Sequence, residues 1–181
     1  FDFNGDGAVE VVYNDECRFR VYDGRDGTVY FSEPSESRTR SEYPIVADVD
    51  NDGDFDCFIT NHSTTMTLLE NDGSGYFTDI TPGSGLDISG FALQAKLADF
   101  DNDGFVDVVI SGGIHRYMRN NGDGTFVQSD AFPYGDTMHS FAVGDVNRDG
   151  FMDLYASYGN GYNSPDNGND DILWINDGND N

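Results

Sequence analysis

One acidic motif occurs four times in this chain, and it holds most of the residues that could do chemistry. The copies begin at Asp2, Asp48, Asp99 and Asp145, so they are spaced 46, 51 and 46 residues apart. Each copy has Asp or Asn at its first, third and fifth positions, glycine at the sixth and an acid at the ninth. Alternating carboxylate and amide oxygens around a glycine turn are the ligands that hard cations prefer. We therefore expect these four segments to bind cations.

The third copy shows how such a segment would hold an ion. Asp99, Asp101 and Asp103 alternate, the carbonyl of Phe105 turns inward, and Asp107 closes the loop. Five protein oxygens suit Ca²⁺, which accepts six to eight oxygens at about 2.3–2.6 Å, better than Mg²⁺, which demands a strict octahedron. The opening resembles an EF-hand loop, but the closing acid is at the ninth position rather than the twelfth, and strand-like runs flank it. The motif thus predicts calcium loops outside the EF-hand fold.

A polar turn without metal is the alternative, because Asp and Asn form Asx-turns on their own. Four copies that all end in an acid argue against it, since three or four converging carboxylates repel one another strongly without a cation. The first and fourth copies have Asn4 and Asn147 at the third position, which keep an oxygen but lose a charge. We expect weaker binding in those two copies.

A second, glycine-rich motif repeats in step with the acidic one. Its copies are Asp23–Val29, Asn71–Phe77 and Asn120–Phe126, and a fourth begins at Asn176. Such turns between β-branched and apolar runs predict β-hairpins. Around the second acidic copy the runs are Pro44–Ala47, Cys57–Thr60, Met66–Leu69 and Phe77–Ile80. Each repeat is therefore predicted to hold four strands, with the acidic loop between the first two and the glycine-rich turn between the last two.

The period of the repeat predicts the architecture. Periods of this length built from strands are typical of β-propellers, and no segment shows a sustained helical period. We predict an all-β, β-propeller segment of four-stranded antiparallel blades over residues 1–181, with repeats at about 1–34, 43–83, 91–133 and 139–181. The first repeat lacks its first strand and the last repeat its last strand. We expect a partial propeller of about three and a half to four blades, part of a longer one.

The charge of the chain narrows its partners. Its 181 residues include 34 acids and 9 basic residues, which gives a formal net charge of −25. Nucleic acid and anionic membranes require positive charge, so neither is an expected partner, whereas cations are. The chain is 37% hydrophobic and 14% aromatic, which is enough for a packed core. No run approaches the ~18 apolar residues of a membrane span, so membrane insertion is not expected.

The two motifs together resemble the FG-GAP/VCBS repeats of integrin α-subunit propellers and of many bacterial surface proteins. The likeness lies in the acidic loops, in the strands that end in Ala-Asp or Gly-Asp before them, and in the Asn-x-Gly-x-Gly-x-Phe turns. The segment from Leu69 to Ile110 is especially similar to cartilage-acidic-protein-like repeats. In that family the oxygens at loop positions one, three, five, seven and nine bind Ca²⁺, with position seven acting through its backbone carbonyl. The resemblance implies up to four Ca²⁺ ions, held by Asp2, Asn4, Asp6, Ala8 and Glu10; Asp48, Asp50, Asp52, Asp54 and Asp56; Asp99, Asp101, Asp103, Phe105 and Asp107; and Asp145, Asn147, Asp149, Phe151 and Asp153.

A ligand site is expected on the face away from the calcium loops, because binding residues concentrate on connections that a rigid scaffold positions. His62, His115 and His139 fall in connections of that face, but without a Ser-His-Asp or Cys-His spacing they do not indicate a catalytic or zinc site. The long connection between Tyr158 and Asp171 is predicted to be the most specific surface, with a solvated, mobile insertion as the alternative. The predicted ligand-binding residues are Arg116, Tyr134, Tyr162, Asp166 and Asp170, with Asp171 beside them.

Two functions fit these observations. The first is a rigid calcium-binding scaffold for cell adhesion, for glycan or protein binding on the non-calcium face, or for assembly with other extracellular subunits. The second is part of a polysaccharide-degrading enzyme, since some calcium-containing lyases resemble this propeller. A lyase needs basic and acidic groups clustered for proton abstraction. The scarcity of Lys and Arg favours the non-enzymatic scaffold.

The metal also predicts a compartment. Weak calcium loops need the millimolar Ca²⁺ found outside cells, which favours a secreted or cell-surface location. Cys17 and Cys57 would there either pair as a disulfide or remain buried free thiols. Asn61-His-Ser63 is an N-glycosylation sequon, which matters only in a eukaryotic source.

Overall fold

The chain is all-β in the residues that its computed structural model describes. These are residues 1–35, 43–113, 115–130, 138–158 and 171–178. They hold fourteen strands and no helix. No helix that could cross a membrane occurs among them. The predicted fold class is confirmed.

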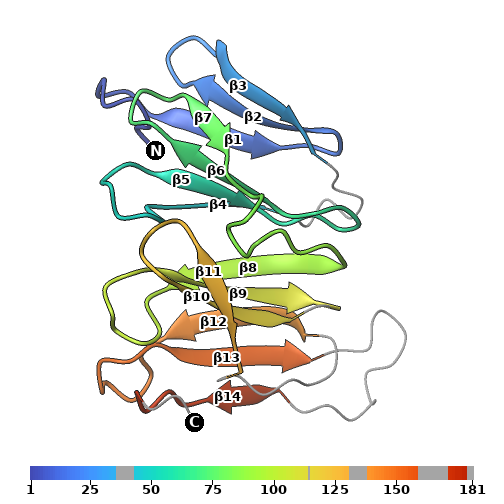
Figure 1. Cartoon of the computed structure of the whole chain (residues 1–181), viewed down its shortest axis with the longest axis vertical. Helices are drawn as coiled ribbons and strands as arrows, with labels where there is room; N and C mark the ends of the chain where they lie inside the picture. The colour runs from blue at the N-terminus through green and yellow to red at the C-terminus, as the bar shows by residue number, and fades with distance from the viewer. Residues whose placement is uncertain (36–42, 114, 131–137, 159–170, 179–181) are drawn as a thin grey trace.

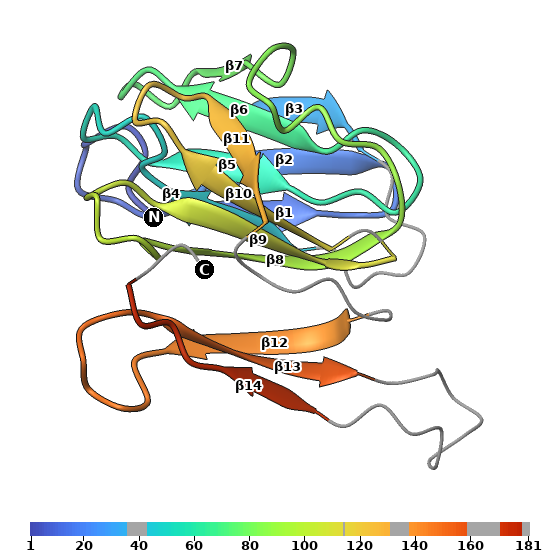
Figure 2. The ribbon, with the colours of Figure 1, turned by 60° about the horizontal axis from the view of Figure 1, so that its bottom comes forward.

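The strands form four antiparallel units stacked along the longest axis of the molecule, which we call blades 1 to 4 in chain order (Figure 1). Blade 1 is β1 (Glu10–Asn14), β2 (Arg18–Asp23) and β3 (Val29–Pro34); blade 2 is β4 (Pro44–Ala47), β5 (Asp56–Ile59), β6 (Thr67–Asn71) and β7 (Phe77–Asp79); blade 3 is β8 (Ala92–Ala98), β9 (Asp107–Gly112), β10 (Arg116–Asn120) and β11 (Phe126–Ser129); blade 4 is β12 (Met138–Gly144), β13 (Asp153–Tyr158) and β14 (Ile172–Trp174). Consecutive strands pair within each blade, and a single pair, Met138 with Gly112, also joins β12 to β9. Figure 2 shows blade 4 as a layer beneath β8.

The strand pattern matches the prediction closely. All four strands of blade 2 fall on the four predicted apolar runs, with ends that differ by at most two residues. Blade 1 begins at β1, whose first residue, Glu10, is the ninth residue of the first acidic copy. Blade 4 has the three strands that the sequence predicts for it.

The core lies between the blades rather than within any one of them. Strands β5 and β9 are buried along their whole length, because each is covered by a neighbouring blade on both faces. Side chains alternate along β5, so Cys57 and Ile59 pack toward blade 1, whereas Phe58 packs toward blade 3. Each such fully buried side chain contributes about 1.5–3 kcal/mol of burial free energy. Apolar side chains on both faces of β5 and β9 therefore hold neighbouring blades together.

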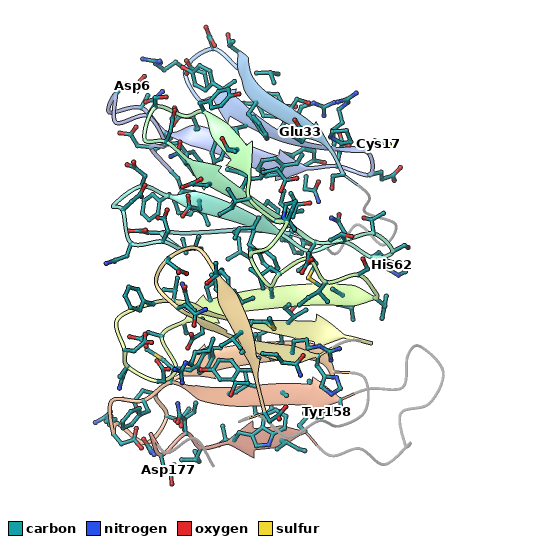
Figure 3. All side chains as sticks on the ribbon, in the orientation of Figure 1. Asp6, Cys17, Glu33, His62, Tyr158 and Asp177 are labelled. Atoms are coloured by element: carbon teal, nitrogen blue, oxygen red, sulfur yellow. The ribbon has the colours of Figure 1, made fainter. Side chains whose placement is uncertain are left out.

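The stack has two edges that carry different connections between strands. The acidic loops and the glycine-rich turns share one edge, which we call the loop edge, and the remaining connections share the opposite edge. Figure 3 shows Asp6 and Asp177 on the loop edge, and Cys17, His62 and Tyr158 on the other side of the molecule. Antiparallel pairing forces this separation, since alternate connections of a meander lie at opposite ends of its strands.

The two cysteines are free thiols in different surroundings. Cys17 is exposed in the turn between β1 and β2, and Cys57 is buried in β5. The disulfide alternative is therefore wrong for this structure, and burial as a free thiol applies to Cys57 only. Burial raises the pKa of the Cys57 thiol well above its usual value, so this thiol is unreactive.

Candidate metal centres

Each acidic copy forms a tight loop with left-handed backbone at its fourth and sixth residues. We number these loops 1 to 4 in chain order. Glycine and asparagine adopt this conformation at little cost, which explains their recurrence at these two positions. Loop 4 has an arginine at the fourth position instead. The residues concerned are Gly5, Asn51, Asn102 and Arg148, with φ of 69, 63, 58 and 66°, and Gly7, Gly53, Gly104 and Gly150, with φ of 83, 99, 96 and 95°.

Backbone N–H groups hold the first and fifth carboxylates of each loop in place, as loop 3 shows. Asp99 Oδ1 accepts the N–H of Asp103 at 3.2 Å, and its Oδ2 accepts the N–H of Gly104 at 3.0 Å. Asp103 Oδ1 accepts the N–H of Phe105 at 2.9 Å. The bond from the sixth N–H to the first carboxylate recurs in loops 1, 2 and 4, at 2.9, 3.1 and 3.0 Å. These Asx-type bonds preorganise the carboxylates before any ion arrives.

The closing acid is buried and ties the loop to its own blade. Asp107 has an exposed fraction of 0%, and its Oδ2 accepts the N–H of Phe100 at 3.1 Å and the hydroxyl of Tyr117 at 2.9 Å. Its Oδ1 accepts the N–H of Asn120, the first residue of the glycine-rich turn, at 2.8 Å. Asp56 and Asp153 make the two equivalent backbone bonds in blades 2 and 4. The ninth position is therefore a structural residue as well as a predicted ligand.

The first asparagine of the glycine-rich turn links each blade to the one before it. Asn71, Asn120 and Asn176 donate through Nδ2 to the carbonyl of the second loop residue of the preceding blade, at 3.0, 2.7 and 2.6 Å. We call these three residues the strut asparagines. That carbonyl lies between the first and third ligand positions of its loop, so each strut asparagine joins one loop to the next. The sequence prediction missed this role, although an asparagine in step with each of the last three loops was a visible signal.

Two of the four loops bring carboxylates together as a cation site requires. Ligand atoms of Asp48, Asp50 and Asp52 lie within 4.8 Å of one another in loop 2, as do those of Asp99, Asp101 and Asp107 in loop 3. No described residues of loops 1 and 4 form such a triad. Asn4 and Asn147 replace one carboxylate there and three acids remain in each loop, so the weaker binding expected of these loops stays a prediction.

The pKa values of several carboxylates in loops 2 and 3 are raised, as is expected where a cation would stabilise them. Burial, with neighbouring carboxylates adding to it, raises the pKa of both Asp50 and Asp101. Burial raises the pKa of Asp56 to about 7 and that of Asp107 to about 6. Asp48 Oδ1 is buried with no hydrogen-bond partner among the described residues. A divalent cation would stabilise all of these carboxylates, so the donor set fits Ca²⁺.

An arginine in the glycine-rich turn of blade 1 reaches loop 1, where it would compete with a cation for the carboxylates. Arg25 Nη2 lies 2.7 Å from Asp6 Oδ2 and 3.0 Å from Asp23 Oδ2. Hydrogen bonds from Arg25 and then from Tyr30 lower the pKa of Asp23. Glu10 Oε1 is buried without a partner in the described part of the chain, so loop 1 retains one oxygen that a cation could use. The sequence prediction did not foresee an internal cation here.

In loops 2, 3 and 4 the seventh residue turns its side chain away toward the glycine-rich turn. A methyl group added at Gly122 would clash with the ring of Phe105, and one added at Gly178 would clash with the ring of Phe151. Asp54 lies against Gly73 in the same way. This direction is consistent with a backbone carbonyl, rather than a side chain, as the seventh ligand.

The predicted ligand-binding residues do not form a described site. Arg116 is half-buried at the start of β10, where Nη1 donates to the carbonyl of His115 at 3.2 Å. Asp171 accepts the hydroxyl of Tyr155 at 2.7 Å. The other predicted residues, Tyr134, Tyr162, Asp166 and Asp170, lie outside the described residues.

The two histidines whose side chains are described have separate surroundings. His62 is half-buried and its ring meets Phe91 edge-on, with ring centroids 4.5 Å apart, whereas burial lowers the pKa of His115. His139 is the second residue of β12 rather than part of a loop, and its side chain is outside the described set.

Together these features define a class of protein: a β-propeller segment with an acidic loop before the second strand of each blade. A family model described as FG-GAP-like repeat matches residues 2–59, 48–110 and 111–156. The chain belongs to this FG-GAP-like repeat family, as the sequence resemblance predicted.

Known relatives carry the same repeats within longer chains. Cartilage acidic protein 1 of Mus musculus and of Homo sapiens are each 29% identical over 127 residues, which is 62% of this chain and 20% and 19% of those proteins. The protein of the same name from Xenopus tropicalis is 29% identical over 135 residues. This chain spans about a fifth of the length of these relatives.

A solved structure supports the fold. It is that of an Agrocybe aegerita lectin, described as recognising non-reducing terminal N-acetylglucosamine, and it covers 98% of this chain and 51% of the lectin chain. The TM-score is 0.52 at 21% identity, so the likeness concerns the fold alone.

Proposed function

We propose that this chain is a calcium-binding, extracellular propeller module that uses its opposite edge to bind glycan or protein partners. The observation that carries the calcium part is the pair of carboxylate triads in loops 2 and 3, whose ligand atoms lie within 4.8 Å of one another. Loops 1 and 4 share the same backbone frame with one carboxylate fewer. They are proposed as weaker sites.

Calcium would stiffen the stack through residues that already connect its parts. The ion would be held by the first, third, fifth and ninth side chains and the seventh carbonyl, and when bound it supplies positive charge to a crowded set of carboxylates. The ninth acids of loops 2, 3 and 4 each accept a hydrogen bond from a strut asparagine, and each strut asparagine reaches the loop of the preceding blade. Loss of the ion would leave these buried carboxylates repelling one another at the junctions between blades.

The extracellular and partner-binding parts are supported by charge, metal and fold. A net charge of −25 excludes polyanionic partners, and calcium loops of moderate affinity are filled only where Ca²⁺ is near millimolar. The lectin with the same fold is described as recognising N-acetylglucosamine, which supports glycan as one ligand class. Adhesion or assembly with a protein partner is the other.

The lyase alternative receives less support from the opposite edge. Arg20 and Asp15 do form an acid–base pair there, at 2.6 Å. Backbone and arginine hydrogen bonds lower the pKa of Asp15, and a lyase base needs a pKa raised toward the working pH. The pair is therefore suited to holding the turn rather than to taking a proton.

Thermal unfolding of the whole chain in EDTA, in millimolar Ca²⁺ and in millimolar Mg²⁺ tests the calcium part. Each ion that binds only the folded loops adds about 2.7 kcal/mol at a hundredfold excess over its Kd. Asp103→Ala should remove one site by calorimetric titration. Asp123→Ala is the matched control, because Asp123 lies in the glycine-rich turn of the same blade. Absence of a Ca²⁺-specific rise in Tm would refute this part of the proposal.

The partner-binding part needs a separate experiment. The calcium-loaded wild-type chain is applied to an array of neutral and acidic glycans, and binding of any glycan class supports the proposal. If no glycan binds while Ca²⁺ still raises the Tm, the glycan part fails and the calcium part stands.

A further inference from the structure

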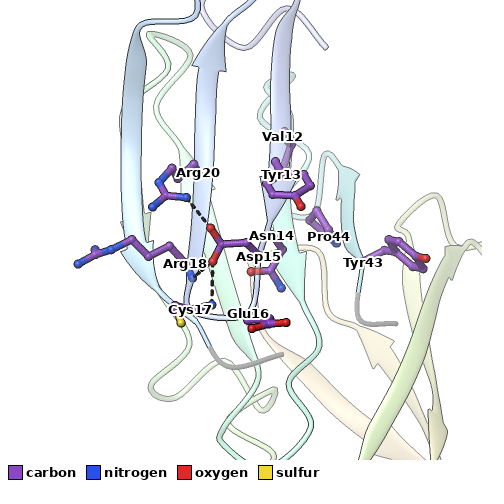
Figure 4. Close-up of a pocket in the computed structure, with 10 residues that line it drawn as sticks. All are labelled: Val12, Tyr13, Asn14, Asp15, Glu16, Cys17, Arg18, Arg20, Tyr43 and Pro44. Carbon is purple, nitrogen blue, oxygen red and sulfur yellow. Dashed lines mark hydrogen bonds and ion pairs between the residues drawn. The ribbon is translucent and has the colours of Figure 1, made fainter. Parts of the chain in front are cut away.

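A hollow of about 660 Å³ lies at the opposite edge, between blade 1 and the start of blade 2 (Figure 4). The turn between β1 and β2 forms one wall, and Tyr43 with Pro44, at the start of β4, forms the other. Arg116, the predicted ligand-binding residue that the structure describes, does not line it. The hollow lies on the edge away from the acidic loops, which is the edge where the sequence analysis expects a ligand site.

Asn14 is the most telling residue in this hollow. Both its Oδ1 and its Nδ2 are buried, and neither has a hydrogen-bond partner among the described residues. A buried amide without partners destabilises the folded state, and such groups are rare outside functional sites. One donor and one acceptor on the same side chain match two adjacent hydroxyl groups of a sugar ring.

A cation and two aromatic rings complete the constellation. Arg20 is held by Asp15 at 2.6 Å, whereas Arg18 forms no side-chain ion pair within the described part of the chain. Tyr13 and Tyr43 are exposed at 55% and 64%. Rigid, amphipathic tyrosine rings offer broad contact area at low entropic cost, and the apolar face of a sugar ring packs on such a surface.

We infer that this hollow binds a neutral, hydroxyl-rich sugar unit of a glycan. Asn14 would hydrogen-bond adjacent hydroxyls, Tyr43 would pack against the ring, and Arg18 would donate to a sugar oxygen. A neutral sugar is favoured over an acidic one because the net charge of −25 repels anions as they approach, and a single free arginine does not offset it. This site rests on the glycan-binding part of the proposed function and gives it a location.

The test uses the whole calcium-loaded chain and the strongest neutral oligosaccharide that the wild-type protein binds on a glycan array, followed by calorimetric titration. Asn14→Ala and Tyr43→Ala should each lower the affinity at least tenfold. Asn121→Ala and Tyr76→Ala are the matched controls and should leave it unchanged, because both residues lie exposed in glycine-rich turns of the loop edge. Asn14→Ala removes an unsatisfied buried amide, so the Tm should stay the same or rise while binding is lost.

Cys17 provides a second measurement, independent of substitutions. It is exposed at the rim of the hollow, so bound oligosaccharide should slow its reaction with a maleimide, and the buried Cys57 should stay unlabelled throughout. If the wild-type chain binds a neutral glycan with neither loss in Asn14→Ala and Tyr43→Ala nor protection of Cys17, the glycan part of the proposed function stands and this location is wrong. Binding of acidic glycans alone would overturn the neutral class. If no glycan binds the wild-type chain, this inference fails together with the glycan part.

Discussion

Asn120 contacts two acidic loops at once, so its replacement by alanine tests whether the blades are linked through these loops. Its Nδ2 donates to the carbonyls of Val49 and Val106 at 2.7 and 3.0 Å, and its Oδ1 accepts the N–H of Gly122 at 2.9 Å. The side chain is buried, with an exposed fraction of 1%. Water therefore has little access to replace these three partners.

The size of the effect follows from those bonds. Each net hydrogen bond is worth about 0.5–1.5 kcal/mol, and a buried carbonyl left without a donor costs more than an exposed one. We expect Asn120→Ala to lower the free energy of unfolding by roughly 2–4 kcal/mol. For a domain of this size that corresponds to a fall in Tm of about 5–15 °C.

The assay is chemical and thermal unfolding of Asn120→Ala beside Asn121→Ala. Asn121 is the next residue of the same turn, but it is exposed and its side chain donates to Thr125 Oγ1 at 2.9 Å. Loss of an exposed bond of this kind changes stability by no more than about 0.5 kcal/mol. Equal losses in the two variants would refute the structural role of the strut.

Calcium titration of the same two variants tests the coupling between loops. Val49 lies between Asp48 and Asp50 of loop 2, and the Asn120 N–H donates to Asp107 of loop 3 at 2.8 Å. Asn120→Ala should therefore weaken Ca²⁺ binding at both loops, without changing the number of sites. A loss of Ca²⁺ affinity confined to loop 3 would show that the strut asparagine does not couple the two loops.

Two further predictions concern charge. Arg25→Gly should strengthen Ca²⁺ binding at loop 1 and lower the Tm in EDTA, because the guanidinium 2.7 Å from Asp6 is removed. Calorimetric titration beside the control variant Arg18→Gly checks this. An unchanged Ca²⁺ affinity at loop 1 would contradict the prediction. In EDTA, the urea midpoint should fall as the pH rises from about 4 to about 7, because Asp56 and Asp107 have folded pKa values raised to about 7 and about 6 and so bind more protons in the folded than in the unfolded state. Saturating Ca²⁺ should abolish this fall, and a midpoint that rises over the same range in EDTA would contradict the argument.

The strands and loops could be predicted because their signals are local and repeated. The apolar run Pro44–Ala47 is a strand with the same bounds in the structure, and Asp99 and Asp101 of the third motif converge with its closing acid, Asp107. A single motif could be a polar turn without metal, whereas four copies that all have an acid at the ninth position are difficult to explain in that way. Asn4 and Asn147 predicted weaker binding in loops 1 and 4, and among the described residues these two loops have no carboxylate triad.

The contacts between repeats could not be predicted in the same way. Arg25 meets Asp6 only because the pairing of β1 with β2 sets Glu10 opposite Asp23, and that register depends on the whole sheet. The hollow beside Asn14 depends on how blade 1 packs against β4, which no pattern along the chain encodes. The strut asparagines are an intermediate case, because their position was visible and their partner was not.

In blade 1 no asparagine occupies the strut position, and other residues hold the glycine-rich turn against the acidic loop. Asp23 stands in its place, and an ionised carboxylate cannot donate to a neighbouring carbonyl. Arg25 and Tyr30 hydrogen-bond Asp23 instead, and the same guanidinium reaches Asp6. Ala8 leaves open the space that phenylalanine fills in blades 3 and 4, so the arginine fits. These three differences from the other blades are linked. Asp23 requires a neighbouring cation, Arg25 supplies it, and Ala8 leaves room for the arginine side chain. Arg25 thus offsets part of the negative charge of loop 1 from within the chain, and under the proposed function the stronger Ca²⁺ sites are loops 2 and 3, at the middle of the stack (Figure 1).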